Sequence, residues 1–195
     1  MTPAEQKVYL GELRPYLIAS VIFFAVGVAF GLAIVFRFPQ FTEYFGESVT
    51  GFLRMFRGLA KPELALAIFL NNTIKTLIAI LLGAALGIVP ALFLVANGVV
   101  LGAVFFMSAQ GRGLWLSLMS ILPHGIFELP AVFLGTSIGF MLGDRALKRL
   151  LGHLETKFAS DLRRALSFFA TAIVPLLLLA ALVEAFVTTT LVAGF

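Results

Sequence analysis

The sequence predicts an all-helical bundle that crosses a membrane about five times, with one half-helix and two amphipathic helices at the membrane surface. Hydrophobic residues make up 61% of the chain and charged residues 12%, whereas about 25% of an ordinary soluble domain is charged. Mean hydropathy is +1.06. Several apolar runs approach the roughly 20 residues that a helix needs to cross a bilayer. The 195 residues are therefore expected to form a single membrane domain, 1–195.

The first half of the chain predicts two spans separated by a surface helix. Residues 17–36 are uncharged over 20 positions and contain Gly27 and Gly31, a spacing that lets two helices approach closely. In residues 38–61, apolar side chains recur at three- and four-residue steps with charged ones between them. This pattern predicts an amphipathic helix lying on the membrane, or else a docking surface for a partner protein. The second span, 64–86, follows a proline, which is common at the first helical position.

The middle of the chain predicts two further spans around an interruption. Residues 90–107 form the third span after a tight reversal. Residues 114–122 are too few to cross the hydrocarbon as a helix. We therefore expect a half-helix or re-entrant segment that turns at Pro123, because proline removes a helical hydrogen bond. The fourth span is 126–142.

The end of the chain predicts a second amphipathic helix and the last span. Residues 144–165 carry a leucine stripe flanked by lysines and arginines, and residues 166–192 are mostly apolar. Such a basic helix suits an anionic cytoplasmic leaflet. With five spans, the basic residues on the side of the N-terminus outnumber those on the other side by eight to five. The positive-inside rule therefore predicts a cytoplasmic N-terminus.

Polar residues interrupt four of the apolar segments. They are Asn71, Asn72 and Lys75, then Asn97, then His124 and Glu128, and finally Glu184. His124 and Glu128 are four positions apart and share a helix face. Ionisable groups at membrane depth are costly and usually face a partner or a wet cavity. We expect these residues to gather in one buried polar site.

The chemistry of that site has several interpretations. The residues can pair with one another and fix helix registry, or they can form an ion or proton pathway. His124 and Glu128 are candidate metal ligands, but zinc usually takes three or four protein ligands, so a divalent metal is only weakly indicated. The chain has no cysteine, and no set of catalytic residues stands out. The basic residues flank membrane segments, which argues against a nucleic-acid partner.

Several motifs in the central part of the chain resemble those of the stage II sporulation protein M family. They are Asn71-Asn72, Leu86-Gly87-Ile88, Asn97-Gly98 with Gly102, and Leu122-Pro123-His124-Gly125-Ile126-Phe127-Glu128-Leu129-Pro130-Ala131. In spore formers, the resemblance implies a membrane component that acts with cell-wall hydrolases during engulfment. In other organisms, it implies an integral membrane protein without an assigned activity.

The function predicted from these observations is a membrane scaffold or assembly component. Its expected partners are membrane lipids, proteins of the membrane or cell envelope, and a second copy of the chain through Gly27 and Gly31. The alternative is a transporter or channel for a small solute, ion or proton. A metal-dependent membrane enzyme is a third hypothesis.

Overall fold

The computed structural model describes residues 1–43, 46–47 and 58–188. Within them, the side chains of Ser120, Ile121, Pro123, His124 and Thr188 lie outside the description. The helices are, in order, α1 (Pro3–Arg37), α3 (Lys61–Leu82), α4 (Ile88–Arg112), α5 (Leu114–Leu150), α6 (Phe158–Phe168), η1 (Phe169–Ile173), α7 (Val174–Val183) and η2 (Glu184–Thr188). In this described part of the chain, five helical stretches are long and apolar enough to cross a membrane. The all-helical class is therefore confirmed. Half of the surface helix predicted over 38–61, namely residues 44–45 and 48–57, lies outside the described residues.

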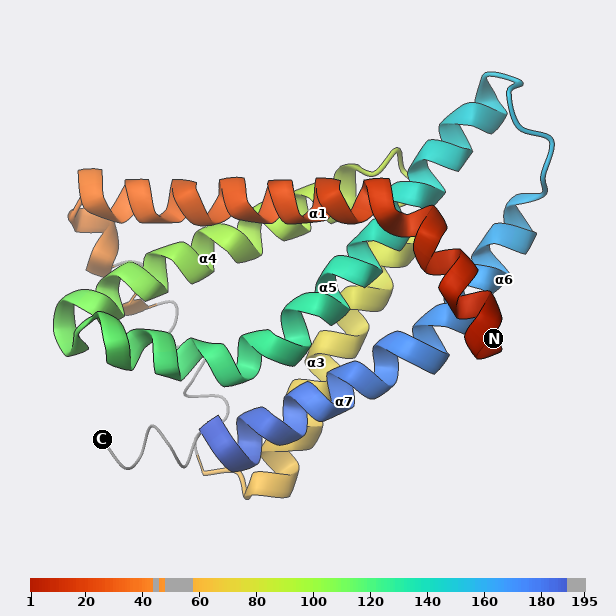
Figure 1. Cartoon of the computed structure of the whole chain (residues 1–195). Coiled ribbons are helices and arrows are strands. Elements are labelled where there is room, and N and C mark those ends of the chain that lie inside the picture. The colour runs from red at the N-terminus through yellow and green to blue at the C-terminus, as the bar shows by residue number, and fades with distance from the viewer. Residues whose placement is uncertain (44–45, 48–57, 189–195) are drawn as a thin grey trace.

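Successive long helices run in alternating directions, as Figure 1 shows. The N-terminus, the turn at residues 83–87 and the loop at residues 151–157 therefore lie toward one end of the bundle, which we call the N-terminal end. This alternation is what five successive crossings require. The orientation of the bundle in the membrane, with the N-terminus in the cytoplasm, remains a prediction.

Helix α1 joins the first predicted span to the polar residues that precede it, 3–16, which we call the polar lead. Thr2 and Glu5 form a capping box around its start, and Pro3 occupies its first turn, so the free amides of that turn gain partners. Pro15 lies inside the helix, and Figure 1 shows the N-terminal turns set at an angle to the rest. Proline is a common cause of such a bend. The bend lets the first turns of α1 lie beside α6.

The turn predicted at Pro123 is not present, because residues 114–122 continue as helix into the fourth span. How deeply residues 114–122 enter the membrane stays a prediction. Helix α4 continues to Arg112, and Gly113, with φ 85°, separates it from α5. Helix α5 then runs through Pro123 to Leu150 without a break. Membrane helices tolerate proline because neighbouring helices, side chains and local adjustments satisfy the freed backbone groups. The hydrogen bond that Pro123 removes is therefore not enough to end this helix.

The basic amphipathic segment also differs from its prediction as one helix over 144–165. Helix α5 extends to Leu150, residues 151–157 form a loop, and α6 begins at Phe158. Helix α6 then continues through the π-helical turn η1 into α7 and a second π-helical turn, η2. Pro175, in the first turn of α7, directly follows η1. Since proline offers no amide hydrogen, the hydrogen-bond ladder changes its spacing there.

Glycines bring helices α1 and α4 into backbone contact along what we call the first glycine seam: Gly27 and Gly31 on α1, and Gly98 and Gly102 on α4. A Cβ added to Gly27 would lie 2.5 Å from the carbonyl oxygen of Val95. Added to Gly98, it would lie 2.8 Å from the amide nitrogen of Val28. Gly27 and Gly31 thus allow two helices of the same chain to pack closely. A homodimer through this face would have to displace α4.

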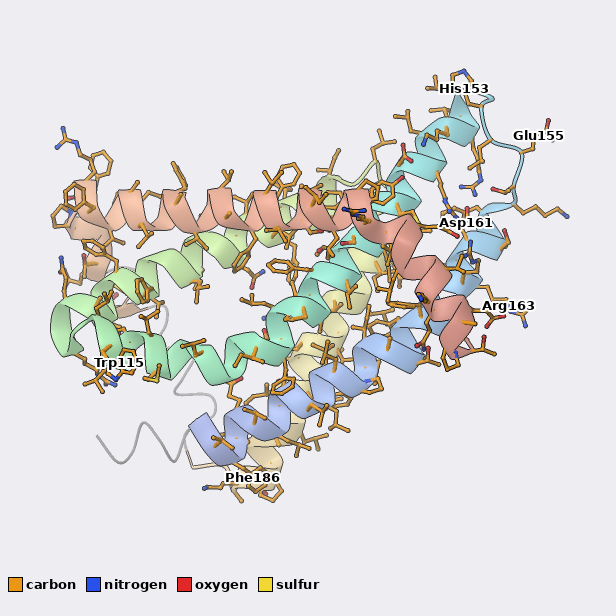
Figure 2. The ribbon with its side chains drawn as sticks, viewed as in Figure 1. Trp115, His153, Glu155, Asp161, Arg163 and Phe186 are labelled. Carbon is orange, nitrogen blue, oxygen red and sulfur yellow. The ribbon has the colours of Figure 1, made fainter. Side chains whose placement is uncertain are left out.

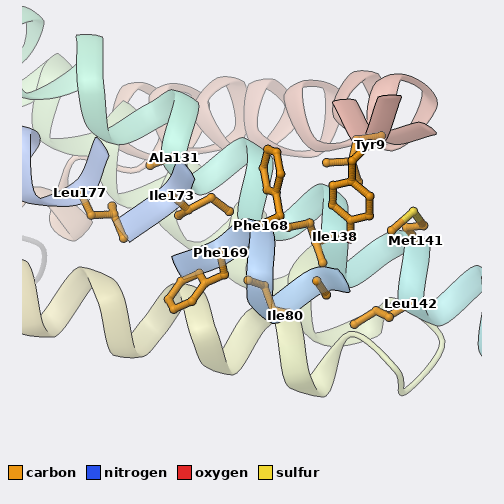
Figure 3. Close-up of a cluster of buried hydrophobic side chains, with 12 residues drawn as sticks. Tyr9, Ile80, Ala131, Ile138, Met141, Leu142, Phe168, Phe169, Ile173 and Leu177 are labelled. Carbon is orange, nitrogen blue, oxygen red and sulfur yellow. The ribbon is translucent and has the colours of Figure 1, made fainter. Parts of the chain in front are cut away.

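A second glycine seam joins α3 and the 83–87 turn to α5. It comprises Gly83 and Gly87, facing Gly139 and Gly143. A Cβ added to Gly143 would lie 2.5 Å from the amide nitrogen of Gly87, and one added to Gly139 would lie 2.6 Å from the carbonyl oxygen of Ala79. Beside this seam, Figure 3 shows the main apolar cluster, to which α1, α3, α5, α6, η1 and α7 contribute. The two seams and this cluster fix the positions of the polar residues described next.

Candidate functional site

One polar group predicted from the sequence joins α3 to α5. The Asn72 Nδ2 atom donates to Glu128 Oε2 at 2.8 Å, and the Asn71 Nδ2 atom donates to Asn72 Oδ1 at 3.0 Å. All three residues are partly buried. Two segments 56 residues apart in the chain thus meet through an amide and a carboxylate. In hydrocarbon, where water offers no alternative partner, such a pair satisfies both groups.

The other predicted site residues are placed differently. Asn97 is exposed and donates to the carbonyl oxygen of Phe93, one turn back in its own helix, at 2.7 Å. Asn97 therefore does not join the Asn72–Glu128 pair, and the close approach of α4 to α1 at this point is made by the neighbouring Gly98. Lys75 is exposed on α3. Glu184 is partly buried and begins η2, which packs against α3 and α5. The side chain of His124 lies outside the described residues.

The metal hypothesis stays a prediction. Among the residues that the structure describes, no three histidine, cysteine or acidic side chains are grouped so that they could hold a metal ion. One of the two predicted ligands, His124, is not included in that set. Glu128, the other, is the acceptor of the Asn72 amide. The described atoms of the site suit a hydrogen-bonded carboxylate that holds a position or binds a proton.

Three hydroxyl groups form a second polar cluster in the apolar interior, between α1 and α5. Thr136 Oγ1 lies 3.0 Å from Ser20 Oγ, and Ser20 Oγ lies 3.2 Å from Ser137 Oγ. All three side chains are buried, and Thr136 also donates to the Val132 carbonyl at 2.8 Å. Sequence reasoning missed this cluster. Adjacent hydroxyl residues in an apolar span were the available signal.

The largest polar group is an ion-pair network at the N-terminal end of the bundle. Arg145 on α5 pairs with Glu12 on α1 at 2.8 Å and with Asp161 on α6, and Arg149 also pairs with Asp161. Asp161 lies on α6 where this helix approaches α1 (Figure 2), and its side chain is only 5% exposed. A carboxylate this buried requires cationic partners. The network therefore ties three helices together.

Three further contacts extend this network along α1. Arg164 pairs with Glu12 at 2.8 Å, and its guanidinium lies 5.0 Å from the centre of the Tyr9 ring, within the range of a cation–π contact. The Tyr16 hydroxyl donates to Asp144 at 2.5 Å. In each of these contacts, one partner is a residue of the polar lead of α1: Glu12, Tyr9 or Tyr16. The lead therefore packs as part of the bundle.

The basic pattern over residues 144–165 predicts arginines that face an anionic leaflet. The structure instead directs the guanidinium groups of Arg145, Arg149 and Arg164 to carboxylates within the protein. The physical reason is that Asp161 and Glu12 lie on faces that the bundle covers, and their charges need nearby cations. An aspartate among several basic residues was a signal of inward pairing. The leucine stripe alone does not contain this signal.

Comparison with known families gives one assignment. The profile described as Stage II sporulation protein M matches residues 20–189, a range that contains both glycine seams, the Asn72–Glu128 pair and most of the ion-pair network. Comparisons with curated proteins and with solved structures found no match. Because the matched range covers most of the chain, the family resemblance of the central motifs is confirmed. The chain belongs to the stage II sporulation protein M family.

Proposed function

We propose that this protein is a membrane scaffold or assembly component whose bundle keeps one fixed arrangement. The observation that carries the proposal is backbone contact along the two glycine seams. A scaffold must hold the helices that it presents to other proteins in constant positions. Contact between backbones supports this because, at the glycine positions, no side chain lies between the helices to absorb a displacement.

The seams join elements that a transport cycle would have to separate. At the first seam, a Cβ on Gly102 would lie 3.1 Å from the amide nitrogen of Leu32. Helix α5 packs against α1, α3, α4 and α7, so a tilt of α5 disturbs several interfaces together. Packed interfaces move between discrete arrangements rather than deforming gradually. The ion-pair network adds a further restraint at the N-terminal end of the bundle.

A transporter or channel is the second candidate, and the Asn72–Glu128 pair favours it. Carboxylates inside membrane segments commonly belong to proton or ion pathways. Glu128 is partly buried and lies in the helical stretch Gly125–Leu150, which is long and apolar enough to cross a membrane. The two candidates differ in one physical requirement, which is movement of the helices. They also differ in whether the protein carries ions, protons or a small solute across the membrane.

Spin labels can measure this movement directly, because the chain contains no cysteine that would compete for labelling. Cysteines replacing the exposed residues Leu92 and Leu178 place one label on α4 and one on α7. Double electron–electron resonance in proteoliposomes should give one narrow distance distribution, unchanged by pH or by sodium and potassium gradients. The same label pair in Gly98→Ala, where the first seam is disturbed, is the control that shows the labels report displacement.

Flux assays complete the test. Liposomes that contain the scaffold should hold proton, sodium and potassium gradients as well as empty liposomes do. A gradient-dependent second distance, together with flux that disappears in Glu128→Gln, would replace the scaffold proposal with the transporter. A fixed distance without flux supports the scaffold.

The assembly part of the proposal needs a partner that recognises a defined surface. Leu150 and Leu151, at the end of α5, are 81% and 58% exposed. Chemical cross-linking in native membranes, followed by mass spectrometry, should give a reproducible envelope protein linked near this loop. Leu150→Ser should reduce that link, whereas Glu155→Gln in the same loop should leave it unchanged. Equal links in both variants would show that the assembly surface lies elsewhere.

A further inference from the structure

A groove lies between the first turns of α1 and helix α6, at the N-terminal end of the bundle. Its volume is about 560 Å³, and Ala4 and Val8 line it from α1, whereas Arg163, Arg164 and Ser167 line it from α6. This volume falls within the range of small-molecule binding sites. The groove is distinct from the Asn72–Glu128 pair and from the two glycine seams. No step of the scaffold proposal uses it.

The two walls of the groove differ in chemistry. The α1 wall presents the apolar side chains of Ala4 and Val8 together with one carboxylate, Glu5, and Val8 is 63% exposed although it is hydrophobic. The α6 wall is cationic. Figure 2 shows Arg163 directed outward beside the N-terminal turns of α1, and within the described part of the chain this arginine pairs with no carboxylate. A ligand that fits both walls carries an anionic group and a hydrocarbon group.

The second arginine of the groove is held in place by the ion-pair network. Arg164 binds Glu12 and lies over the Tyr9 ring, so its guanidinium is positioned before any ligand arrives. Its side chain remains 39% exposed. Glu5 is an acidic residue at the groove, but its Oε2 atom accepts the amide hydrogen of Thr2 at 2.7 Å. That carboxylate is thus directed to the start of its own helix.

The groove also lies at a suitable depth for a lipid headgroup. Arg163 and Arg164 directly precede an uncharged run over residues 165–183, which belongs to the apolar stretch Phe158–Val187. Arginines next to the end of an apolar span lie at the interface between hydrocarbon and water. Phosphate groups of phospholipids occupy the same layer.

We propose that this groove binds one anionic phospholipid. Arg163 and Arg164 receive the phosphodiester, for which guanidinium groups are well suited because they present several donors in one plane. An acyl chain lies along Ala4 and Val8. The bound lipid connects α1 to α6. A lipid headgroup and free inorganic phosphate both present phosphate oxygens to the arginines. Ala4 and Val8 favour the lipid, because only the lipid also carries a hydrocarbon chain.

Native mass spectrometry of the full chain in detergent can count the bound lipids. The probes are phosphatidylglycerol and phosphatidylcholine with identical acyl chains, and inorganic phosphate serves as the competitor. The variants are Arg163→Gln, which removes the unpaired charge, and Ala4→Trp, which fills the groove. Arg112→Gln, at the exposed end of α4 away from the groove, is the matched control for loss of one positive charge.

The wild-type chain should retain one phosphatidylglycerol in preference to phosphatidylcholine. Arg163→Gln should weaken this binding about fivefold, which corresponds to one basic residue near an anionic lipid surface. Ala4→Trp should weaken it at least as much, and Arg112→Gln should leave it unchanged. Inorganic phosphate at the same concentration should not displace the lipid.

Three outcomes would overturn the proposal. Equal retention of both lipids would show that the groove does not select an anion. Equal loss in Arg163→Gln and Arg112→Gln would show that only overall charge matters. Displacement by inorganic phosphate alone would assign the arginines to a free anion. Arg163 is exposed and makes no ion pair in the described chain, so its variant tests the proposal even where Ala4→Trp fails to fold.

Discussion

Replacing Gly98 by alanine adds one carbon atom at the point where α4 touches α1. The new Cβ would overlap the carbonyl oxygen of Phe24 and lie 2.8 Å from the amide nitrogen of Val28 and 3.0 Å from the Cα of Gly27. All three contacts are with backbone atoms. A change of side-chain rotamer cannot relieve them, so α1 and α4 must separate.

The magnitude follows from two opposing contributions. Overpacking of a well-packed interior costs about 1–3 kcal/mol, and rigid backbone neighbours place this site near the upper value. Alanine favours the helix over glycine by about 1 kcal/mol. The net loss in the free energy of unfolding should therefore be about 2 kcal/mol. Gly111→Ala on the same helix is the control, because its Cβ would have no neighbour within 4 Å, and it should stabilise the protein by up to about 1 kcal/mol.

The two variants should thus change stability in opposite directions. Unfolding by denaturant in lipid bicelles, followed by circular dichroism, measures the free energy of unfolding for each variant and for the wild-type chain. A stabilising effect of Gly98→Ala similar to that of Gly111→Ala would refute the reasoning. It would mean that α1 and α4 are not in backbone contact at this position.

Three further predictions concern the polar groups. A double-mutant cycle of Asn72→Ala and Glu128→Ala, measured by the same unfolding assay, should give a coupling of about 0.6–1.7 kcal/mol, the range found for hydrogen bonds between membrane helices; additive effects would contradict the pair. Asp161→Asn should lower the free energy of unfolding by about 3 kcal/mol, because two arginines lose the carboxylate that they share at a side chain only 5% exposed; a loss below about 0.5 kcal/mol would contradict its burial. Tyr16→Phe removes the donor to Asp144 and should lower the thermal unfolding midpoint by an amount that corresponds to about 1 kcal/mol, whereas an unchanged midpoint would show that water replaces the phenol.

The coarse fold could be predicted because apolar runs have few alternatives in a membrane. Uncharged stretches such as residues 17–36 and 90–107 become helices since hydrocarbon offers the backbone no other partner. Helix ends were less predictable. The third span was predicted over 90–107, but α4 runs on to Arg112. The run through Pro123 was expected to break, but it continues α5. Polarity and proline change the stability of a helix locally, whereas its ends depend on neighbours that a single sequence does not show.

For the polar contacts, too, the residues could be identified from the sequence more readily than their partners. Asn72 and Glu128 could be named from the sequence because polar residues in apolar runs are conspicuous. The structure places the Asn72 Nδ2 atom 2.8 Å from Glu128 Oε2. The partnership of Arg145 with Glu12 and Asp161 could not be derived. Arginine at the end of a span pairs equally well with lipid phosphate or with a carboxylate. Which partner it takes depends on how α1 and α6 approach α5, and that approach is a tertiary property.

The glycines show which sequence signal carries this tertiary information. Between helices in lipid, apolar side chains gain little from contact with one another, because lipid tails are equally apolar. Hydrophobic periodicity therefore identifies the spans but does not determine how they pair. Helix α5 carries Gly135, Gly139 and Gly143 at four-residue steps, so all three lie on one face. That face meets Thr76, Ala79 and the 83–87 turn at distances that no larger residue allows. Small residues at this spacing therefore mark the pairing of helices within the chain, and the polar groups follow from the pairing.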